Sequence, residues 1–456
     1  MVALNDWPWR DHARRHPDRS AMIAGNRQLS WFALAQQVDA LAAGFLCQGV
    51  YTGCGVIMKA VNSQQAALAY LALLQCGVRL LPLNPRIPQA QIDVLLPGLN
   101  IDFALILSGT PLPGVAALFL HSQQKAVSCP WQPQALATMT LTSGSSGVAK
   151  AAVHTFQAHL ASAAGVVEKL CFSAEDSWLL SLPLYHVSGQ GIIWRWLRAG
   201  ARLVLAEATP LPQALEQSTF ASLVPTQLLR LLQQPRRPQH LRTLLLGGAT
   251  IPVGLACGAE ALGIACWCGY GMTETASTIT AKRADESGSV GLPLAGHRIR
   301  VVDGEVQIQS DALASGYWQQ GQLLPLVNDK GWFATRDGGY FNADGLQLTG
   351  RLDNQFFSGG EGIQPEQIEA VLQTHPAVEQ VFIVPEWDLE FGHRPVALVR
   401  LKHAVPLAAL ADWAASHLAG FQRPVSWYPL PEPDGGGIKI SRQWLRTWLA
   451  NRQRME

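Results

Sequence analysis

A run rich in hydroxyl groups and glycine, TMTLTSGSSGVAK (residues 138–150), decides how the rest of the chain is interpreted. Residues 138–141 are typical of a strand end, and the residues after them are typical of a loop that binds phosphate. In such a loop successive backbone amides point inward, and the hydroxyl groups and Lys150 add donors. The run is not a Walker A loop, because Ala149 stands where that pattern has its second glycine. A flexible Ser/Gly linker is the alternative, and the apolar strands expected on both sides argue against it.

The size and composition of the chain favour a globular protein of several parts. With 456 residues it is too long for one ordinary core, and it is 48% hydrophobic and 15% charged. The net charge is +1 and there is no dense Lys/Arg tract, so nothing indicates nucleic acid or an anionic membrane as a partner. The longest apolar stretch, Ala66–Leu74, is far shorter than the roughly 20 residues that span a bilayer. Since the N-terminus also lacks the apolar core of a secretory signal, we expect a cytoplasmic protein without membrane insertion.

The eight cysteines are scattered, with no C-x-x-C pair and no histidine at ligand spacing. We therefore expect reduced, buried thiols rather than a metal site. The alternation in Cys266-Trp267-Cys268 is typical of a strand.

Apolar runs that alternate with helical stretches predict an α/β fold with buried sheets. Ser30 is expected to cap a helix that carries Leu34, Val38, Leu41 and Phe45 on one face. Strands are expected at 102–107, 177–182, 201–206 and 243–246. From about Gly350 the pattern becomes helix 365–372, strands 378–384 and 396–401, helix 407–418 and strand 425–428. This predicts a large N-terminal α/β domain (1–350), a hinge (351–354) and a small C-terminal α+β domain (355–456), with the ligand in the cleft between domains.

The loop at 138–150 resembles the phosphate-binding signature TSGTTGxPK of the acyl-adenylate-forming enzymes. Other motifs of that family follow in order, at Leu182–His186, 247–249, Tyr270–Thr275 (YGMTET), 331–337 (GWFATRD), 350–369 and 439–442 (KISR). The sequence departs from the family at Ala149, where proline is usual, at Ser145-Ser146 for two threonines, at Arg336 for glycine, and by Ile438 inserted before Lys439.

The resemblance implies ATP-dependent activation of a carboxylic acid, with Mg²⁺ and then coenzyme A as the acceptor. A carboxylate is a poor electrophile, and converting it to an acyl-adenylate gives it AMP as a leaving group. Two anions must be brought together in the first step, which requires cations and fixed donors. The products are the acyl-CoA, AMP and pyrophosphate.

The same resemblance assigns roles to individual residues. Lys439 carries adenylation by bridging the substrate carboxylate and the α-phosphate, and Thr142 and Glu274 serve the Mg²⁺–phosphate group. The other expected ATP or AMP contacts are Ser143, Gly144, Ser145, Ser146, Gly147, Lys150, Gly247, Gly248, Ala249, Tyr270, Gly271, Thr273, Asp337 and Arg351. Asp353 matches the hinge position, and Gly359 and Gly360 let backbone approach the pantetheine arm. Taken alone, Glu274 or Lys439 is more often an ordinary surface charge.

The acid is indicated by the run SGQGIIWRWL (residues 188–197). A fatty acid favours an apolar tunnel without an arginine, whereas a second carboxylate favours the planar fork of Arg195. The run resembles that of a bacterial branch of the family whose acid carries an aromatic ring and two carboxylates. The expected acid contacts are His186, Ser188, Gly189, Arg195 and Thr275, with Trp194 flanking the ring or belonging to the core. Arg195 extending to solvent from a helix is the alternative.

Three rival functions stay open at this point. The chain is expected to act on small molecules, as a monomer or homo-oligomer, and another aryl or acyl acid is the nearest alternative. A stand-alone adenylation enzyme that loads a carrier protein is the second, although no carrier motif follows residue 442. A non-catalytic relative is the third, and such a protein is expected to lack Lys439, Glu274 or Thr142.

Overall fold

A computed structural model describes residues 5–87, 89–124, 129–142, 150–207, 209–234, 236–247, 251, 253–358, 361–388, 391–432 and 440–453. The described chain divides into two compact units. The first contains residues up to 299 and 308–333, and the second contains 300–307 and 334–453. Within the described ranges, every helix is too short or too polar to cross a membrane.

Two eight-stranded sheets form the first unit. One has the order β14-β13-β12-β11-β9-β10-β1-β2 and the other β18-β17-β8-β7-β4-β3-β5-β6. Their strands are β1 Ser20–Ala24, β2 Arg27–Ser30, β3 Gly55–Lys59, β4 Arg79–Leu83, β5 Phe103–Ile106, β6 Ala116–Leu118, β7 Leu136–Thr142, β8 Lys150–Thr155, β9 Ser177–Leu179, β10 Arg202–Leu205, β11 Phe220–Leu223, β12 Thr243–Leu246, β13 Ala265–Met272, β14 Ser277–Arg283, β17 Gly316–Gln319 and β18 Gln322–Pro325. The inner strands are largely parallel and buried on both faces, as the continuous apolar runs predict.

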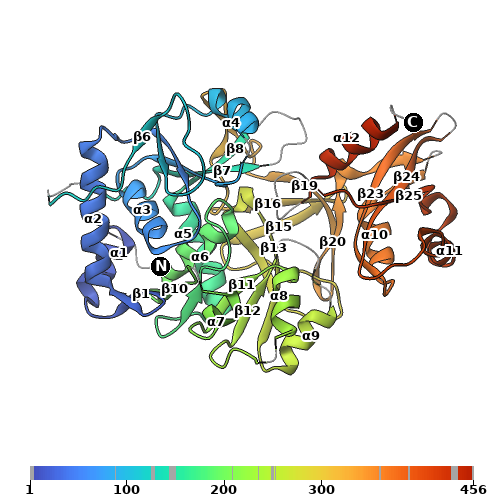
Figure 1. The fold of residues 1–456 in the computed structure, drawn as a ribbon, viewed down its shortest axis with the longest axis horizontal. Helices are drawn as coiled ribbons and strands as arrows, with labels where there is room; N and C mark the ends of the chain where they lie inside the picture. The colour runs from blue at the N-terminus through green and yellow to red at the C-terminus, as the bar shows by residue number, and fades with distance from the viewer. Residues whose placement is uncertain are drawn as a thin grey trace. The chain divides into compact units, whose positions relative to one another are not determined.

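Helices lie between these sheets, where α3, α5 and α6 are seen in Figure 1. The helices of this unit are α1 Pro8–Arg15, α2 Trp31–Cys47, α3 Gln64–Gln75, α4 Gln89–Leu95, α5 Phe156–Lys169, α6 Val187–Ala199, α7 Leu211–Leu215, α8 Pro225–Leu232 and α9 Val253–Ala261, with short 3₁₀ turns at Leu96–Gly98 and Thr273–Thr275. The predicted cap of α2 is confirmed, because the Ser30 hydroxyl accepts the Ala33 amide at 3.2 Å. The four predicted apolar residues of α2 are all buried.

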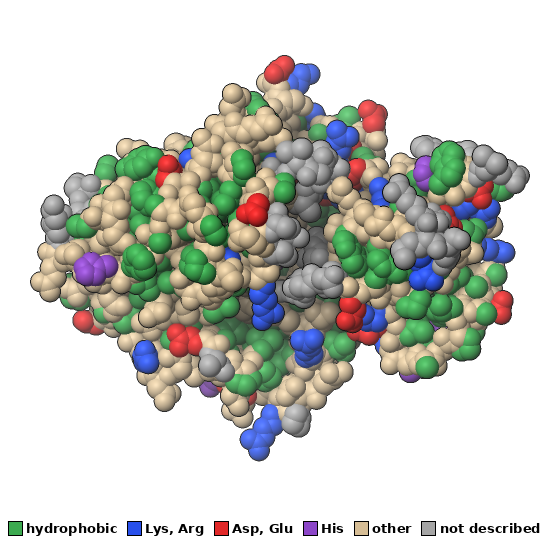
Figure 2. Space-filling view, turned by 45° about the horizontal axis from the view of Figure 1, so that its top comes forward, with side chains coloured by type: hydrophobic (Ala, Val, Ile, Leu, Met, Phe, Trp, Pro, Cys, Tyr) green, Lys and Arg blue, Asp and Glu red, His purple; other side chains and the backbone are tan. Residues whose placement is uncertain are grey.

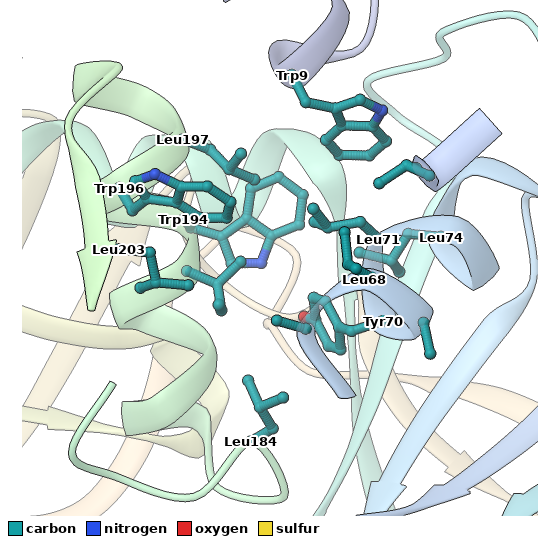
Figure 3. Packing of buried hydrophobic residues seen from close by; sticks show 14 of the residues in the cluster. Trp9, Leu68, Tyr70, Leu71, Leu74, Leu184, Trp194, Trp196, Leu197 and Leu203 are labelled. Atoms are coloured by element: carbon teal, nitrogen blue, oxygen red, sulfur yellow. The ribbon is translucent and has the colours of Figure 1, made fainter. Parts of the chain in front are cut away.

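The core of the first unit is dominated by aromatic side chains. Figure 3 shows Trp194 of α6 beside Leu71 and Tyr70 of α3, with Trp196 on the side of Trp194 that is turned away from α3. Ten consecutive residues of α3, Ala66–Gln75, are buried, so this helix is a fixed internal support. Trp194 therefore belongs to the core, which decides between the two readings of that residue.

The second unit is a smaller α+β assembly. Its helices are α10 Pro365–Gln373, α11 Leu407–His417 and α12 Arg442–Gln453, with 3₁₀ turns at Leu352–Asn354 and Gly420–Gln422. Strands β21 Phe356–Ser358, β22 Glu361–Ile363, β23 Val378–Asp388, β24 Gly392–Leu401 and β25 Ser426–Pro429 form its five-stranded sheet. A four-stranded sheet in the order β15-β16-β19-β20 consists of β15 His297–Val302, β16 Glu305–Ser310, β19 Phe333–Asn342 and β20 Gly345–Arg351. Residues 351–354, the expected hinge, belong to this second compact unit. Their role as a hinge stays a prediction.

The predicted element types are confirmed in both units, but several ends differ. The strands expected at 378–384 and 396–401 are each four residues longer, because β23 extends to Asp388 and β24 begins at Gly392. The strand expected at 177–182 ends at Leu179, because the Leu180 and Leu182 carbonyls accept hydrogen bonds from the Asn62 side chain. The expectation of buried thiols is wrong for Cys47, Cys171 and Cys257, which are exposed. On the face drawn in Figure 2, basic and acidic side chains are dispersed rather than gathered into one patch.

Candidate functional site

The predicted phosphate loop connects two strands of one sheet. β7 and β8 pair antiparallel, and their last register pair is Thr142 with Lys150. The Thr142 Oγ1 lies 3.5 Å from the Lys150 carbonyl oxygen. The loop itself, with Ser143, Gly144, Ser145, Ser146 and Gly147, lies outside the described residues. The strands expected on both sides of the run are confirmed, because both flanks pair in the same sheet, and phosphate binding by the loop stays a prediction.

Glu274 lies near this hairpin through Tyr317 of β17. The Tyr317 hydroxyl donates to Glu274 Oε1 at 2.7 Å, and β17 pairs with β8. The Lys150 ammonium lies 3.7 Å from the centre of the Tyr317 ring. Neither Glu274 nor Lys150 forms an ion pair with another described residue. The half-buried Glu274 carboxylate and the Lys150 ammonium thus both lie next to Tyr317, near the Lys150 end of the loop. Neither charge is neutralised by an ion pair within the described chain.

The YGMTET segment is held in place by its own backbone. A Cβ at Gly271 would lie 1.8 Å from the Ser277 carbonyl oxygen, so only glycine fits there. Thr275 is fully buried, and its hydroxyl contacts the Ser277 carbonyl at 2.8 Å and both backbone groups of Met272. That hydroxyl is engaged inside the segment, and its contact with an acid stays a prediction. Tyr270 is buried in β13, whereas Thr273 is half-buried.

Two buried histidines lie behind this segment. His154 of β8 and His159 of α5 have ring centres 5.1 Å apart, and the His159 Nε2 lies 2.7 Å from the Thr138 hydroxyl. Burial lowers the pKa of His154 to about 4, against the weaker opposing effect of the Glu274 and Thr273 backbone. Burial also lowers the pKa of His159. Both rings are therefore neutral at physiological pH.

Asp337 and Arg351, two of the expected ATP or AMP contacts, lie together in the second unit. Arg351 Nη1 donates to Asp337 Oδ1 at 3.1 Å, and the same guanidinium binds both oxygens of Asp353 at 3.0 and 2.8 Å. The Arg351 contact lowers the pKa of Asp353, although burial opposes it. Arg336 has φ of +63° and an exposed side chain. That left-handed backbone explains why the family has glycine there.

Several predicted residues lie outside the described ranges. These are Gly248 and Ala249 of the adenine motif, Gly359 and Gly360 of the thiol side, and Lys439 with the inserted Ile438. Gly247 is described and is half-buried just after β12.

Arg195 is the most informative of the predicted acid contacts. It is 2% exposed, so the alternative in which it extends to solvent is wrong. One terminal nitrogen, Nη2, donates to Ser277 Oγ and to Thr278 Oγ1, each at 3.1 Å, and the Nε is buried without a partner. No carboxylate of the described chain pairs with it, and burial lowers the pKa of Arg195. A buried guanidinium whose hydrogen bonds in the described chain go to hydroxyl groups, and not to a carboxylate, is suited to an incoming anion.

The other acid contacts surround the start of α6. His186 precedes the helix and is exposed, so it is not a core histidine, and Ser188 is half-buried. A Cβ at Gly189 would lie 2.1 Å from the Pro183 carbonyl oxygen, so glycine lets α6 pack on the preceding turn. Contact of these three residues with the acid stays a prediction.

The sequence reasoning missed Tyr317, Ser277 and Thr278 as parts of the site. Ser277 and Thr278 follow the YGMTET motif after a single residue, Ala276, and Ser277 has the unusual φ of +127° for a residue other than glycine. Their position next to a motif was the one signal in the sequence that could have identified Ser277 and Thr278. Tyr317 had none, because only strand pairing brings β17 beside β8.

Comparisons with known proteins agree with this arrangement. Residues 9–318 match the model of the AMP-binding enzyme family, and residues 367–432 match that of the AMP-binding enzyme C-terminal domain. The 2-succinylbenzoate–CoA ligase of Salmonella typhimurium is 53% identical over 98% of this chain and 99% of that protein.

Two solved structures are similar over nearly the whole chain. The R195K form of E. coli MenE with bound OSB-AMS has a TM-score of 0.92 at 51% identity, covering 99% of this chain and 100% of that one. The o-succinylbenzoate coenzyme A synthetase of Bacillus subtilis, in complex with ATP and magnesium ion, has a TM-score of 0.87 at 26% identity, covering 97% and 99%.

Proposed function

Because this chain belongs to the AMP-binding enzyme family, we infer that it is an AMP-forming acid–CoA ligase that acts on 2-succinylbenzoate. It converts this acid, ATP and coenzyme A into 2-succinylbenzoyl-CoA, AMP and pyrophosphate, a step of menaquinone biosynthesis. Relatives of that name cover 98% or more of the chain at 42–53% identity, which supports the assignment over another acyl or aryl acid.

The observation that carries the choice of acid is the buried Arg195. The substrate has two carboxylates, and only one of them is activated. The aromatic carboxylate faces Arg195, directly or through water, and supplies the negative charge that the described chain does not. The aliphatic carboxylate then extends toward ATP.

The surroundings of Thr142 and Glu274 fit a Mg²⁺–nucleotide. Glu274 is a half-buried carboxylate without a cation in the described chain, and Tyr317 orients one of its oxygens. Carboxylate and hydroxyl oxygens are the ligands that Mg²⁺ prefers, and the bound ion neutralises phosphate charge. Lys150 adds a second positive charge at the other end of the loop, and Thr273 donates to the α-phosphate. Asp337 accepts the ribose hydroxyls, with Arg351 fixing its carboxylate.

The reaction proceeds in two substitutions. An oxygen of the aliphatic carboxylate attacks the α-phosphorus, and the bond from that phosphorus to pyrophosphate breaks. The coenzyme A thiol then loses its proton and attacks the acyl carbon, and AMP leaves. We assign Lys439 to the first step and Gly359 and Gly360 to the path of the thiol, with rotation about Asp353 between the steps. The reaction is placed in the cytoplasm, with the protein acting as a monomer or homo-oligomer.

A pyrophosphate-release assay over a panel of acids tests this assignment. With ATP and Mg²⁺, 2-succinylbenzoate is expected to give kcat/KM at least tenfold above that of benzoate, succinate and medium-chain fatty acids. Coenzyme A is expected to be consumed one for one with pyrophosphate. Turnover of a monocarboxylate at an equal kcat/KM would contradict the choice of acid. Pyrophosphate release without consumption of coenzyme A would favour a carrier-loading enzyme.

A further inference from the structure

The side chain of Asn62 holds the turn that leads into the acid pocket. Its Nδ2 donates to the carbonyl oxygens of Leu180 at 3.1 Å and Leu182 at 2.8 Å. Its Oδ1 accepts the Leu184 amide at 3.3 Å. One amide group thus satisfies three backbone groups of residues 180–184, which otherwise lack the ladder that ends at Leu179.

A second amide holds the same turn from the other side. Gln190 of α6 is fully buried, and its Nε2 donates to the Leu184 carbonyl and to Thr140 Oγ1, each at 3.1 Å. Thr140 lies in β7, two residues before Thr142. Gln190 therefore connects the turn before α6 with the strand that leads to the phosphate loop.

Asn62 is itself fixed on rigid structure. The next residue, Ser63, caps α3 through its hydroxyl and the Ala66 amide at 3.1 Å. Helix α3 is buried along its length, and Figure 3 shows its residue Tyr70 directed toward Trp194 of α6. The support of α6 from α3 thus has two parts, an apolar contact along the helices and a polar contact at the turn.

We propose that Asn62 and Gln190 are positioning residues that set the place of α6, and thereby of Arg195, relative to the phosphate loop. Neither side chain is needed to touch the acid for this role, since both act through the backbone of residues 180–184. The inference rests on the proposed function, because it assumes that Arg195 receives the second carboxylate. The length of the substrate limits how far that carboxylate can lie from the reacting one, so a shift of α6 makes the productive geometry harder to reach and weakens binding of the acid, while ATP binding stays intact.

Asn62→Ala tests the role of the first amide. We expect the KM for 2-succinylbenzoate to rise about tenfold, because all three hydrogen bonds that hold the turn are lost and only partly replaced by water. The KM for ATP should stay within twofold. Asn62→Asp should raise the acid KM further, because it keeps the acceptor for Leu184 and sets a carboxylate against two carbonyl oxygens.

Gln48→Ala is the matched control. Gln48 is also a half-buried amide with three backbone hydrogen bonds, donating to Gly44 and Phe119 at 3.0 and 2.9 Å and accepting from the Phe119 amide at 2.8 Å. It ties down a segment outside the acid pocket. We expect Gln48→Ala to lower the melting temperature about as much as Asn62→Ala does, without changing the KM for the acid.

Gln190→Met tests the second amide with nearly unchanged volume, and gives the result if Asn62→Ala fails to fold. A rise in the acid KM at constant ATP KM supports the proposal. An unchanged acid KM in folded Asn62→Ala or Gln190→Met enzyme, or the same rise in Gln48→Ala, overturns it. Failure of the wild-type enzyme to use 2-succinylbenzoate would instead overturn the proposed function, so the two failures are distinguishable.

Discussion

Two arginines of this protein, the buried Arg195 and the half-buried Arg442, have opposite surroundings. Arg195 in the first unit meets hydroxyl groups and the Trp178 ring, with no acidic partner in the described chain. Arg442 in the second unit binds both oxygens of Glu369 and the Ile383 carbonyl, and it lies 3.4 Å from Glu366. Burial acts to lower the pKa of each guanidinium, and at Arg442 the Glu369 carboxylate reverses the direction.

The difference separates an arginine of the fold from an arginine of the site. Arg442 has its counter-charge within the chain, so its pair ties α12 to α10 and β23. Arg195 is desolvated but has no counter-charge within the described chain. An anionic ligand that binds it can offset the free-energy cost of that desolvation. Burial alone does not distinguish a structural arginine from a ligand-binding one. The presence or absence of a carboxylate partner within the described chain does.

The largest effect is expected from breaking the complete pair. Glu369→Gln leaves the half-buried Arg442 charge without its main partner, and should destabilise the second unit by about 3 kcal/mol, the lower end of the range for a buried pair. Urea unfolding followed by hydrogen exchange of α12 and β23 amides measures this. Glu369→Leu combined with Arg442→Met should recover most of the loss, and a double variant as unstable as the single one would contradict the interpretation.

Arg195→Gln is expected to give the reverse pattern. Its folding stability should be unchanged or slightly raised, because a buried charge without a counter-charge is removed. The KM for 2-succinylbenzoate should rise on the order of 30-fold, for about 2 kcal/mol of a charged hydrogen bond. Steady-state kinetics with each substrate varied in turn is the measurement. A parallel rise in the ATP KM would assign Arg195 a structural role instead.

The buried histidine His154 extends the comparison with Arg195, because a histidine can lose its charge when it is buried. His154 is as buried as Arg195, and its pKa of about 4 lies below that of the unfolded chain, 6.5. Since the unfolded chain binds this proton more tightly, stability falls as pH drops from about 6.5 toward 4. His154→Gln should reduce that slope by up to about 1.4 kcal/mol per pH unit. Unfolding midpoints across this pH range check it, and an unchanged slope would show that His154 is not among the titrating groups.

The smallest effect is expected at an exposed arginine. Arg336 occupies a left-handed backbone conformation at φ of +63°, so Arg336→Gly should stabilise the protein by about 0.5–1 kcal/mol. Arg336→Ala retains the Cβ and should not stabilise. Thermal melts of the two variants compare the backbone effect with the loss of charge, and equal melting temperatures would exclude backbone strain.

Much of the fold could be predicted because it depends on local patterns. Ser30 before an apolar face predicted α2 and its cap, and the apolar run at 243–246 predicted β12 with the observed ends. The strand at 177–182 was predicted too long, because the side chain that ends it, Asn62, is distant in sequence. Arg195 could be singled out by its apolar neighbours and its place after a motif. Its partners Ser277 and Thr278 could not, since they meet α6 only through sheet topology.

The pairing of Thr142 with Lys150 has a consequence for how this protein can diverge. The two residues are held at ordinary strand spacing, about 5 Å, by the β7–β8 ladder. Substitutions in the connecting sequence are therefore expected to leave Thr142 and Lys150 in register. Serines at 145 and 146 and alanine at 149, where relatives of the wider family have threonines and proline, are substitutions that such an arrangement can accept. Libraries that vary those three positions while keeping 142 and 150 should consequently retain a larger active fraction than libraries that vary the two ends.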